Sequence, residues 1–100
     1  MQPLNLEWSK DALEDLDVIW EYIAEDSIDN ADSFIDQLID ESYKICEVPQ
    51  SGTVIPEIQN PNYREHYYKG YTIIYEINND RIIVHEVYNQ KRIHIRTYKR

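Results

Sequence analysis

Cysteine and glycine are scarce in this sequence of 100 residues, which contains one cysteine and two glycines. A single cysteine, Cys46, excludes an internal disulfide, and its apolar helical position predicts a buried side chain rather than a nucleophile or a metal ligand. No apolar run approaches the ~20 residues that a membrane-spanning helix needs. Residues 1–4 lack the basic flank and apolar core of a signal peptide. We therefore expect a chain that works in a reducing, cytoplasmic setting and not in a membrane.

Basic residues are almost absent from the first part of the chain. Residues 1–62 hold two basic and fifteen acidic side chains, a net charge of −13, whereas residues 63–100 hold eight basic and four acidic ones, a net charge of +4. The total of −9 argues against nucleic acid as a direct partner, so we expect no sequence-specific nucleic-acid binding by the chain alone. The last ten positions contain five basic residues and no acid, and such asymmetry indicates an interaction surface.

Two amphipathic helices are predicted in the acidic part. Apolar residues recur at three-and-four spacing over residues 10–25 and again over residues 30–47. Ser9 is a suitable N-cap for the first helix, and either Ser27 or Asp29 can cap the second. The second helix ends before a proline, because proline disfavours helical geometry in the residue that precedes it. The short polar break between the two helices predicts an antiparallel helical hairpin.

Strand patterns lie on both sides of the hairpin. Apolar and polar residues alternate over residues 4–8, which predicts a short half-buried strand. Residues 49–62 contain three of the four prolines and are expected to form a loop. Beyond the loop, β-branched and aromatic residues predict three strands, at 63–69, 71–77 and 81–88. A further short strand is possible within 93–98.

The order of these elements predicts the fold class. One strand, a helical hairpin and an antiparallel meander read as β-α-α-β-β-β, a two-layer α+β domain that spans residues 1–100. The helical hairpin is expected to pack on one face of an antiparallel-rich sheet. The other face then needs a cover of its own or a partner, and the many tyrosines after residue 62 suit such a partly wet surface.

Three stretches carry motifs that occur in the same order in a known family. The stretch SKDALEDLDVIWEYIAED (9–26) is similar to a first helix, and ADSFIDQLIDESYKICEVPQSG (31–52) to a second helix that ends in a proline and a small-residue turn. The stretch YREHYYKGYTIIYEINNDRIIVHEVYNQKR (63–92) has an arginine early in one strand, a Gly-Tyr pair opening the next and a basic pair after the last. Together they resemble the RelE/ParE superfamily of bacterial type II toxin–antitoxin toxins, closer to its ParE branch.

The resemblance implies a toxin with a protein partner and no cofactor or metal. ParE-type members poison DNA gyrase by protein–protein contact and are not enzymes, whereas RelE-type members cut messenger RNA in the ribosomal A site. A cognate antitoxin holds both kinds inactive with its C-terminal segment. We expect a ParE-like gyrase inhibitor, with a RelE-like mRNA endoribonuclease as the alternative. A degenerate toxin or adaptor without activity is the third possibility.

The RelE-type alternative implies catalytic residues, which the resemblance places at Arg64, Arg92, His94 and Tyr98. Such a site needs positive charge near the scissile phosphate and a group that moves a proton. The sequence departs from that pattern at Thr72, where RelE-type enzymes carry an arginine, and the loop at 49–62 has no basic residue. Arg64 has a structural alternative as well, in which it pairs with an acidic residue or a backbone carbonyl.

Two further surfaces are predicted by the charge asymmetry and the tyrosines. The target, gyrase or the ribosome, is expected to bind the basic C-terminal segment, namely Asn89, Gln90, Lys91, Arg92, Arg96, Lys99 and Arg100. The same basic residues can also be a solvated tail. The antitoxin is expected to bind between the helices and the sheet edge, where apolar anchors are available at Leu13, Trp20, Tyr67, Tyr71 and Tyr75. The acidic pairs of the first helix carry no metal signature, because no histidine or cysteine shares their face.

Overall fold

A computed structural model describes residues 3–90 of the chain. Its elements follow the predicted order. A first strand β1 (Asn5–Trp8) leads into the helices α1 (Lys10–Ala24) and α2 (Ile28–Glu47). Two 3-10 turns, η1 (Pro49–Ser51) and η2 (Pro56–Ile58), flank a short strand β2 (Thr53–Val54). The strands β3 (Tyr63–Tyr68), β4 (Tyr71–Asn78) and β5 (Arg81–Asn89) complete the sheet.

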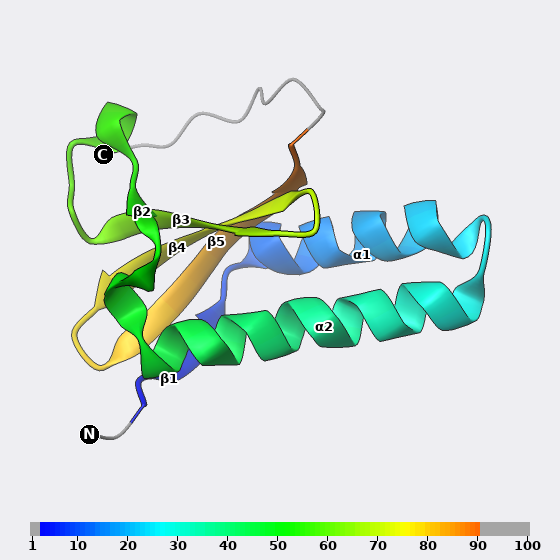
Figure 1. The fold of residues 1–100 in the computed structure, drawn as a ribbon, viewed down its shortest axis with the longest axis horizontal. Helices are drawn as coiled ribbons and strands as arrows, with labels where there is room; N and C mark the ends of the chain where they lie inside the picture. The colour runs from blue at the N-terminus through cyan, green and yellow to red at the C-terminus, as the bar shows by residue number, and fades with distance from the viewer. Residues whose placement is uncertain (1–2, 91–100) are drawn as a thin grey trace.

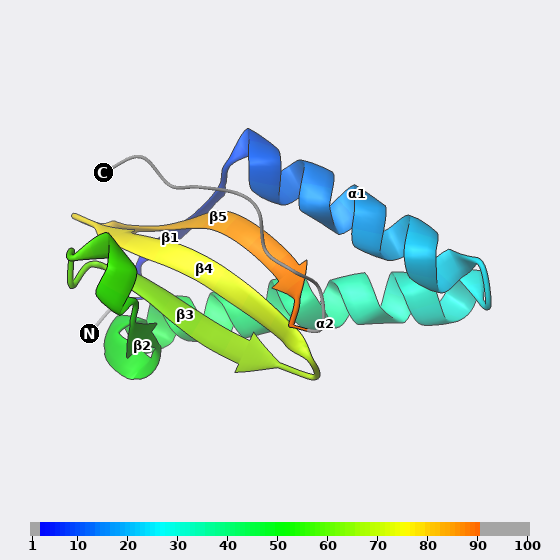
Figure 2. The same cartoon turned by 90° about the horizontal axis from the view of Figure 1, so that it is seen from above.

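The fold is α+β with two layers, as the element order predicted. Five strands form one sheet in the order β1-β5-β4-β3-β2, and the helical hairpin covers one of its faces. The pairs β2–β3, β3–β4 and β4–β5 are antiparallel, whereas β1 and β5 are parallel. The turn end of the hairpin projects well beyond the sheet in both views (Figures 1 and 2).

Both helices begin at serine caps. The Ser9 hydroxyl accepts a hydrogen bond from the Ala12 N–H, and the Ser27 hydroxyl accepts one from the Asn30 N–H. Each cap satisfies a backbone donor that the first helical turn leaves without a partner. Ser27 and not Asp29 therefore caps the second helix, so α2 starts two residues before the predicted start at residue 30. The first helix ends one residue before the predicted end at residue 25.

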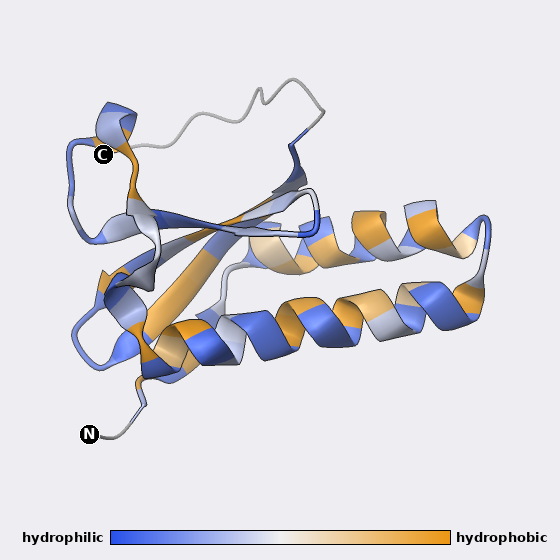
Figure 3. Ribbon diagram, viewed as in Figure 1, coloured by the Kyte–Doolittle hydropathy of each residue, from blue (hydrophilic) through white to orange (hydrophobic). Residues whose placement is uncertain are grey.

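The main core lies between the hairpin and the central strands. Its fully buried members include Ala12 of α1, Leu38 of α2 and Tyr75, Ile82 and Val84 of the sheet. Both helices alternate between apolar and polar segments along their length, and apolar residues dominate the central strands (Figure 3). Burial of the apolar stripes against the sheet supplies most of the driving force for this arrangement.

A second, smaller cluster covers part of the other sheet face. Ile55 and Ile58, from the loop that follows α2, pack on Ile74 of β4, with Tyr63 and Tyr88 beside them. The predicted loop at 49–62 thus provides part of the cover that this face needs. It also contains β2, which the sequence did not predict and which pairs with β3.

β5 contains one more residue than the part of β4 that it pairs with, and this changes the sheet face toward which its side chains point. Ile74 lies opposite Glu86 and Tyr75 lies opposite Val84, so β5 has one residue more than β4 between these two pairs, namely His85. Such a bulge shifts the alternation of side chains by one position. As a result Val84 and Val87, three residues apart, both reach the main core.

A tyrosine hydroxyl fastens the loop after α2 to the sheet. The Tyr75 hydroxyl donates to the Pro49 carbonyl oxygen at 2.7 Å and accepts from the Gly52 N–H at 3.0 Å. A β-carbon on Gly52 would meet the Tyr75 hydroxyl and would lie 2.8 Å from the Glu65 carbonyl oxygen. Glycine is therefore required at this position by close packing.

Replacing Tyr75 by phenylalanine tests this fastening. The change Tyr75→Phe leaves the ring in the core but removes the partner of two backbone groups, so we expect the free energy of unfolding to fall by about 1–3 kcal/mol. Urea denaturation measures the change. The control is Tyr22→Phe, at a position on α1 that is 59% exposed. Equal unfolding midpoints for the two variants would contradict a structural role for the Tyr75 hydroxyl.

Candidate functional site

The predicted catalytic residues fall in two parts of the chain. Arg92, His94 and Tyr98 lie outside the described residues. Arg64 lies on β3 and points its guanidinium at the loop after α2. Its Nε donates to the Pro61 carbonyl oxygen at 3.1 Å, and its Nη1 donates to those of Gln50 and Gly52 at 3.3 and 3.0 Å. This is the carbonyl-binding alternative that the sequence left open for Arg64.

The predicted target-binding residues are described only in part. Asn89 is the last residue of β5, and the N–H of Gln90 donates to the Gly70 carbonyl oxygen at 2.9 Å. Both residues therefore lie where β5 leaves the sheet, next to the turn between β3 and β4. The other members of the set lie outside the described residues: Lys91, Arg92, Arg96, Lys99 and Arg100.

The predicted antitoxin anchors divide by exposure. Leu13 is 50% exposed and Tyr67 is 53% exposed, and Trp20 is half-buried, so these three stay predicted contact residues. The prediction is wrong for Tyr71 and Tyr75, which are 9% and 0% exposed. Both point from β4 toward the helices and belong to the main core. The residue type suggested a partly wet surface, but the helices cover the sheet face on which both side chains lie.

The sheet face away from the helices carries tyrosines and carboxylates. Tyr67, Thr72 and Tyr88 lie side by side on β3, β4 and β5. Thr72, the position at which the RelE branch carries an arginine, is 1% exposed. Burial raises the pKa of Tyr67 and Tyr88, and nearby carboxylates, Glu65 among them, raise it further. Such a face favours neutral tyrosines and disfavours the approach of a phosphate.

The cations of the described sheet are engaged by neighbouring groups. Arg81 Nη1 donates to both carboxylate oxygens of Glu7, at 3.0 and 3.1 Å. Lys69 Nζ donates to the Gln37 side-chain oxygen at 2.8 Å, and Arg64 binds the three carbonyls named above. Residues 3–90 hold five basic and nineteen acidic side chains, a net charge of −14. The described part of the molecule therefore offers no concentration of positive charge for a nucleic-acid backbone.

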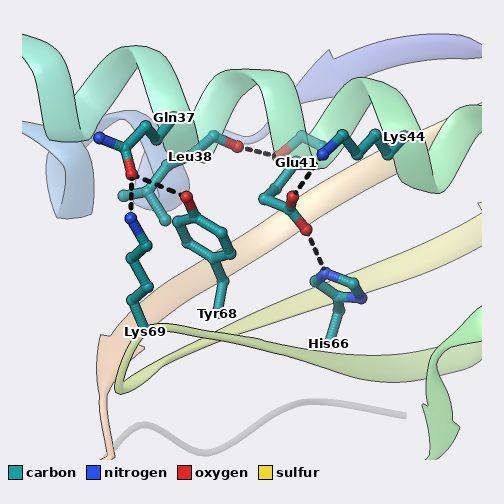
Figure 4. Close-up of polar contacts among 8 residues, drawn as sticks. Gln37, Leu38, Glu41, Lys44, His66, Tyr68 and Lys69 are labelled. Atoms are coloured by element: carbon teal, nitrogen blue, oxygen red, sulfur yellow. Dashed lines mark hydrogen bonds and ion pairs between the residues drawn. The ribbon is translucent and has the colours of Figure 1, made fainter.

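A row of polar contacts joins α2 to β3, and the sequence did not point to it (Figure 4). Glu41 binds Nε2 of His66 at 2.8 Å through one carboxylate oxygen and Nζ of Lys44 at 3.1 Å through the other. One turn earlier, the Gln37 side-chain oxygen accepts from the Tyr68 hydroxyl at 2.7 Å. The spacing of Gln37 and Glu41 by one helical turn was the available signal, because such residues share a face.

The row also perturbs a carboxyl group. Burial opposes the charge of Glu41, but hydrogen bonds from His66 and Lys44 outweigh it and hold the pKa of Glu41 below its ordinary value of 4.5. The contact with His66 is partly buried, because 13% of the Glu41 side chain and 23% of the His66 side chain are exposed, whereas the Lys44 side chain is 70% exposed and solvent screens its contact. Within residues 3–90, no group of three or more histidine, cysteine, aspartate or glutamate side chains can hold a metal ion. No described helix is long and apolar enough to span a membrane.

The Glu41 contacts predict a specific pH dependence. Because the folded pKa is depressed, the charge of Glu41 stabilises the fold above pH 4.5, and this contribution disappears as the pH falls through the lower folded value. We expect Glu41→Gln to lower the free energy of unfolding at pH 7 by about 1–2 kcal/mol, with the difference from the parent chain closing in acid. Denaturation at a series of pH values measures it. Asp36→Asn, an exposed change on the same helix, is the control, and a difference that stays constant with pH would refute the linkage.

Comparisons with known proteins give a consistent picture. Residues 6–94 match the family model described as the ParE toxin of type II toxin-antitoxin system, parDE. Among solved structures, the chromosomal ParDE system of P. aeruginosa superposes with a TM-score of 0.71 at 17% identity, covering 86% of this chain and 95% of that one. The RelBE2 toxin-antitoxin complex of Mycobacterium tuberculosis gives a TM-score of 0.65 at 12% identity, with 88% and 99% coverage. No curated protein sequence matches the chain. At these identities the structures share the fold.

Proposed function

The chain belongs to the family of ParE toxins of type II toxin–antitoxin systems, within the RelE/ParE superfamily, and we propose that it inhibits DNA gyrase by protein–protein contact. A cognate antitoxin neutralises it. The segment from Asn89 to Arg100 contacts the target, because it carries half of the basic residues of the chain and leaves an otherwise acidic body.

The state of the cations on the sheet is the observation that carries the proposal. A ribosome-dependent nuclease needs positive charge around the phosphate that it cleaves. Arg64, Lys69 and Arg81 are instead bound by backbone carbonyls, a glutamine and a glutamate. Thr72 stands where RelE-type enzymes carry an arginine, and Glu65 lies close to the tyrosines on either side of Thr72. These features support inhibition by binding over cleavage of RNA.

Two assays on the purified toxin separate the proposed function from its alternative. Addition to gyrase and plasmid should abolish supercoiling and trap gyrase-bound DNA breaks, while primer extension on translating ribosomes should detect no A-site cleavage. Ribosomal cleavage that vanishes in Arg92→Ala would establish the nuclease instead. If production without antitoxin leaves both growth and gyrase unaffected, the chain is a degenerate toxin.

Replacing Arg64 tests its structural role against a catalytic one. Lysine keeps the charge but cannot reproduce the planar fork that reaches three carbonyls, so Arg64→Lys should lower the free energy of unfolding by about 1–2 kcal/mol. Gyrase inhibition should stay unchanged when equal concentrations of correctly folded parent chain and variant are compared. The gyrase assay and the primer-extension assay described above measure this. The matched control is Lys10→Arg, a change between cations at an exposed position in the first turn of α1. Unchanged stability combined with lost activity would return Arg64 to the catalytic site.

A further inference from the structure

The second half of β5 continues past the end of β1. The β1–β5 pairing ends at Trp8 and Val84, but β5 runs on to Asn89, over the helical hairpin (Figure 2). In the described part of the chain, the sheet offers no strand beside this edge of β5 from the bulge onward. Val87 is only 2% exposed, and a buried N–H without a hydrogen-bond partner destabilises a fold. The N–H of Val87 therefore needs an acceptor that is not part of a strand.

Side chains from the start of α1 take the place of a neighbouring strand. The Ser9 hydroxyl donates to the His85 carbonyl oxygen at 3.0 Å, and Oδ2 of Asp15 accepts from the Val87 N–H at 2.9 Å. The two contacts follow β5 in chain direction, first at the bulge and then two residues beyond it. Asp15 is half-buried, so its hydrogen bond is partly shielded from water. The helix α1 thus holds the β5 edge beyond the point that β1 reaches.

The opposite edge of β5 is held up to its last residue as well. Asn89 lies opposite Tyr71 in the β4–β5 pairing, and the Gln90 N–H donates to the Gly70 carbonyl oxygen at 2.9 Å. Gly70 has a φ of 85°, in the left-handed region that glycine adopts without strain, and forms the turn between β3 and β4. The end of β5 is therefore fixed from both sides, by α1 and by this turn.

We propose that Asp15 is a positioning residue for target binding: its hydrogen bond to Val87 sets the direction in which the chain leaves β5 at Asn89 and Gln90. The inference rests on the proposed function, which assigns the contact with gyrase to the segment that starts at Asn89. Asp15 acts through the backbone of β5 and not by contacting the target. A segment whose start is already fixed loses less conformational entropy on binding, so this preorganisation increases affinity.

Substitutions at Asp15 separate the hydrogen bond from the charge. Asparagine removes the charge but keeps a side-chain oxygen that can accept from the Val87 N–H, whereas leucine, of similar size, removes both. Asp17→Leu is the control, because Asp17 is exposed on the same helix and the change alters the net charge equally. Asp15→Ala is a second variant without an acceptor, and alanine favours the helix, so it serves if Asp15→Leu fails to fold.

Amide hydrogen exchange, measured by NMR on the toxin alone, reports the positioning directly. Asp15→Leu should speed exchange at Val87 and Gln90 by about tenfold or more relative to Ile73, a fully buried residue at the centre of the sheet. The comparison with Ile73 separates local loosening of β5 from a general loss of stability. Asp15→Asn and Asp17→Leu should leave this ratio within about twofold of the parent value.

Gyrase inhibition by equal concentrations of folded protein is the second measurement. Asp15→Leu should raise the concentration that halves supercoiling activity by about tenfold or more, because the binding segment starts from a less defined position. Asp15→Asn should restore inhibition to within about threefold of the parent chain, and Asp17→Leu should leave it unchanged. A purely structural role of Asp15 would not produce this loss at equal concentrations of folded protein.

Three results would overturn the inference: unchanged exchange at Val87 in Asp15→Leu, faster exchange there with undiminished inhibition of gyrase, or equal losses of inhibition in Asp15→Asn and Asp15→Leu, which would assign the effect to charge. If the parent chain does not inhibit gyrase, the proposed target is refuted. The exchange measurement uses no gyrase, so it still decides whether Asp15 holds the end of β5.

Discussion

The parallel pairing of β1 with β5 is the constraint on which the rest of the structure depends. It joins the first described strand to the last, with Leu6 opposite Ile82 and Trp8 opposite Val84. Ser9 then turns the chain into α1 while it remains attached to β5. Its N–H donates to the Val84 carbonyl oxygen, and its hydroxyl donates to the His85 carbonyl oxygen and accepts from Ala12. Strand pairing and helix capping are thus combined in one residue, so the hairpin starts at a defined place over the sheet.

The charged side chains of the described residues divide into cations that hold the fold together and acids that lie mainly on the surface. The described cations of the sheet hold structure together: Arg64 binds loop carbonyls and Arg81 binds Glu7. The acids, by contrast, lie mainly on the exposed sides of the helices and at the edge of the tyrosine-bearing sheet face. Such a molecule repels nucleic acid and attracts basic protein segments. This electrostatic behaviour is what the proposed inhibition through protein–protein contact requires.

The two sides of α2 have different tasks. The side toward β3 is occupied by Gln37 and Glu41, whose contacts with Tyr68, Lys69 and His66 fix the helix to the sheet edge (Figure 4). On the side toward α1, Asp32 accepts a hydrogen bond from Trp20 Nε1 at 2.7 Å, which joins the two helices of the hairpin.

Local chemistry in the sequence determined the elements of this protein and their order. The helical period gave the two amphipathic helices, serine at the caps set their starts within two residues, and β-branched residues with Asn79 at positive φ set the β4–β5 hairpin.

Arg64 stood out in the sequence, but its three carbonyl partners come from a loop whose path local patterns do not specify. Side-chain alternation predicts which residues share a face of a strand, yet it does not say which face the helices cover. Tyr71 and Tyr75 were therefore misplaced, while Tyr67 on the neighbouring strand is exposed. Only the tertiary structure decides which face of the sheet the helices cover. It does so through the parallel β1–β5 pairing, the extra residue at His85 and the Trp20–Asp32 contact, which depend on residues that are not neighbours in the sequence. Their energies depend on the whole core and not on neighbouring residues.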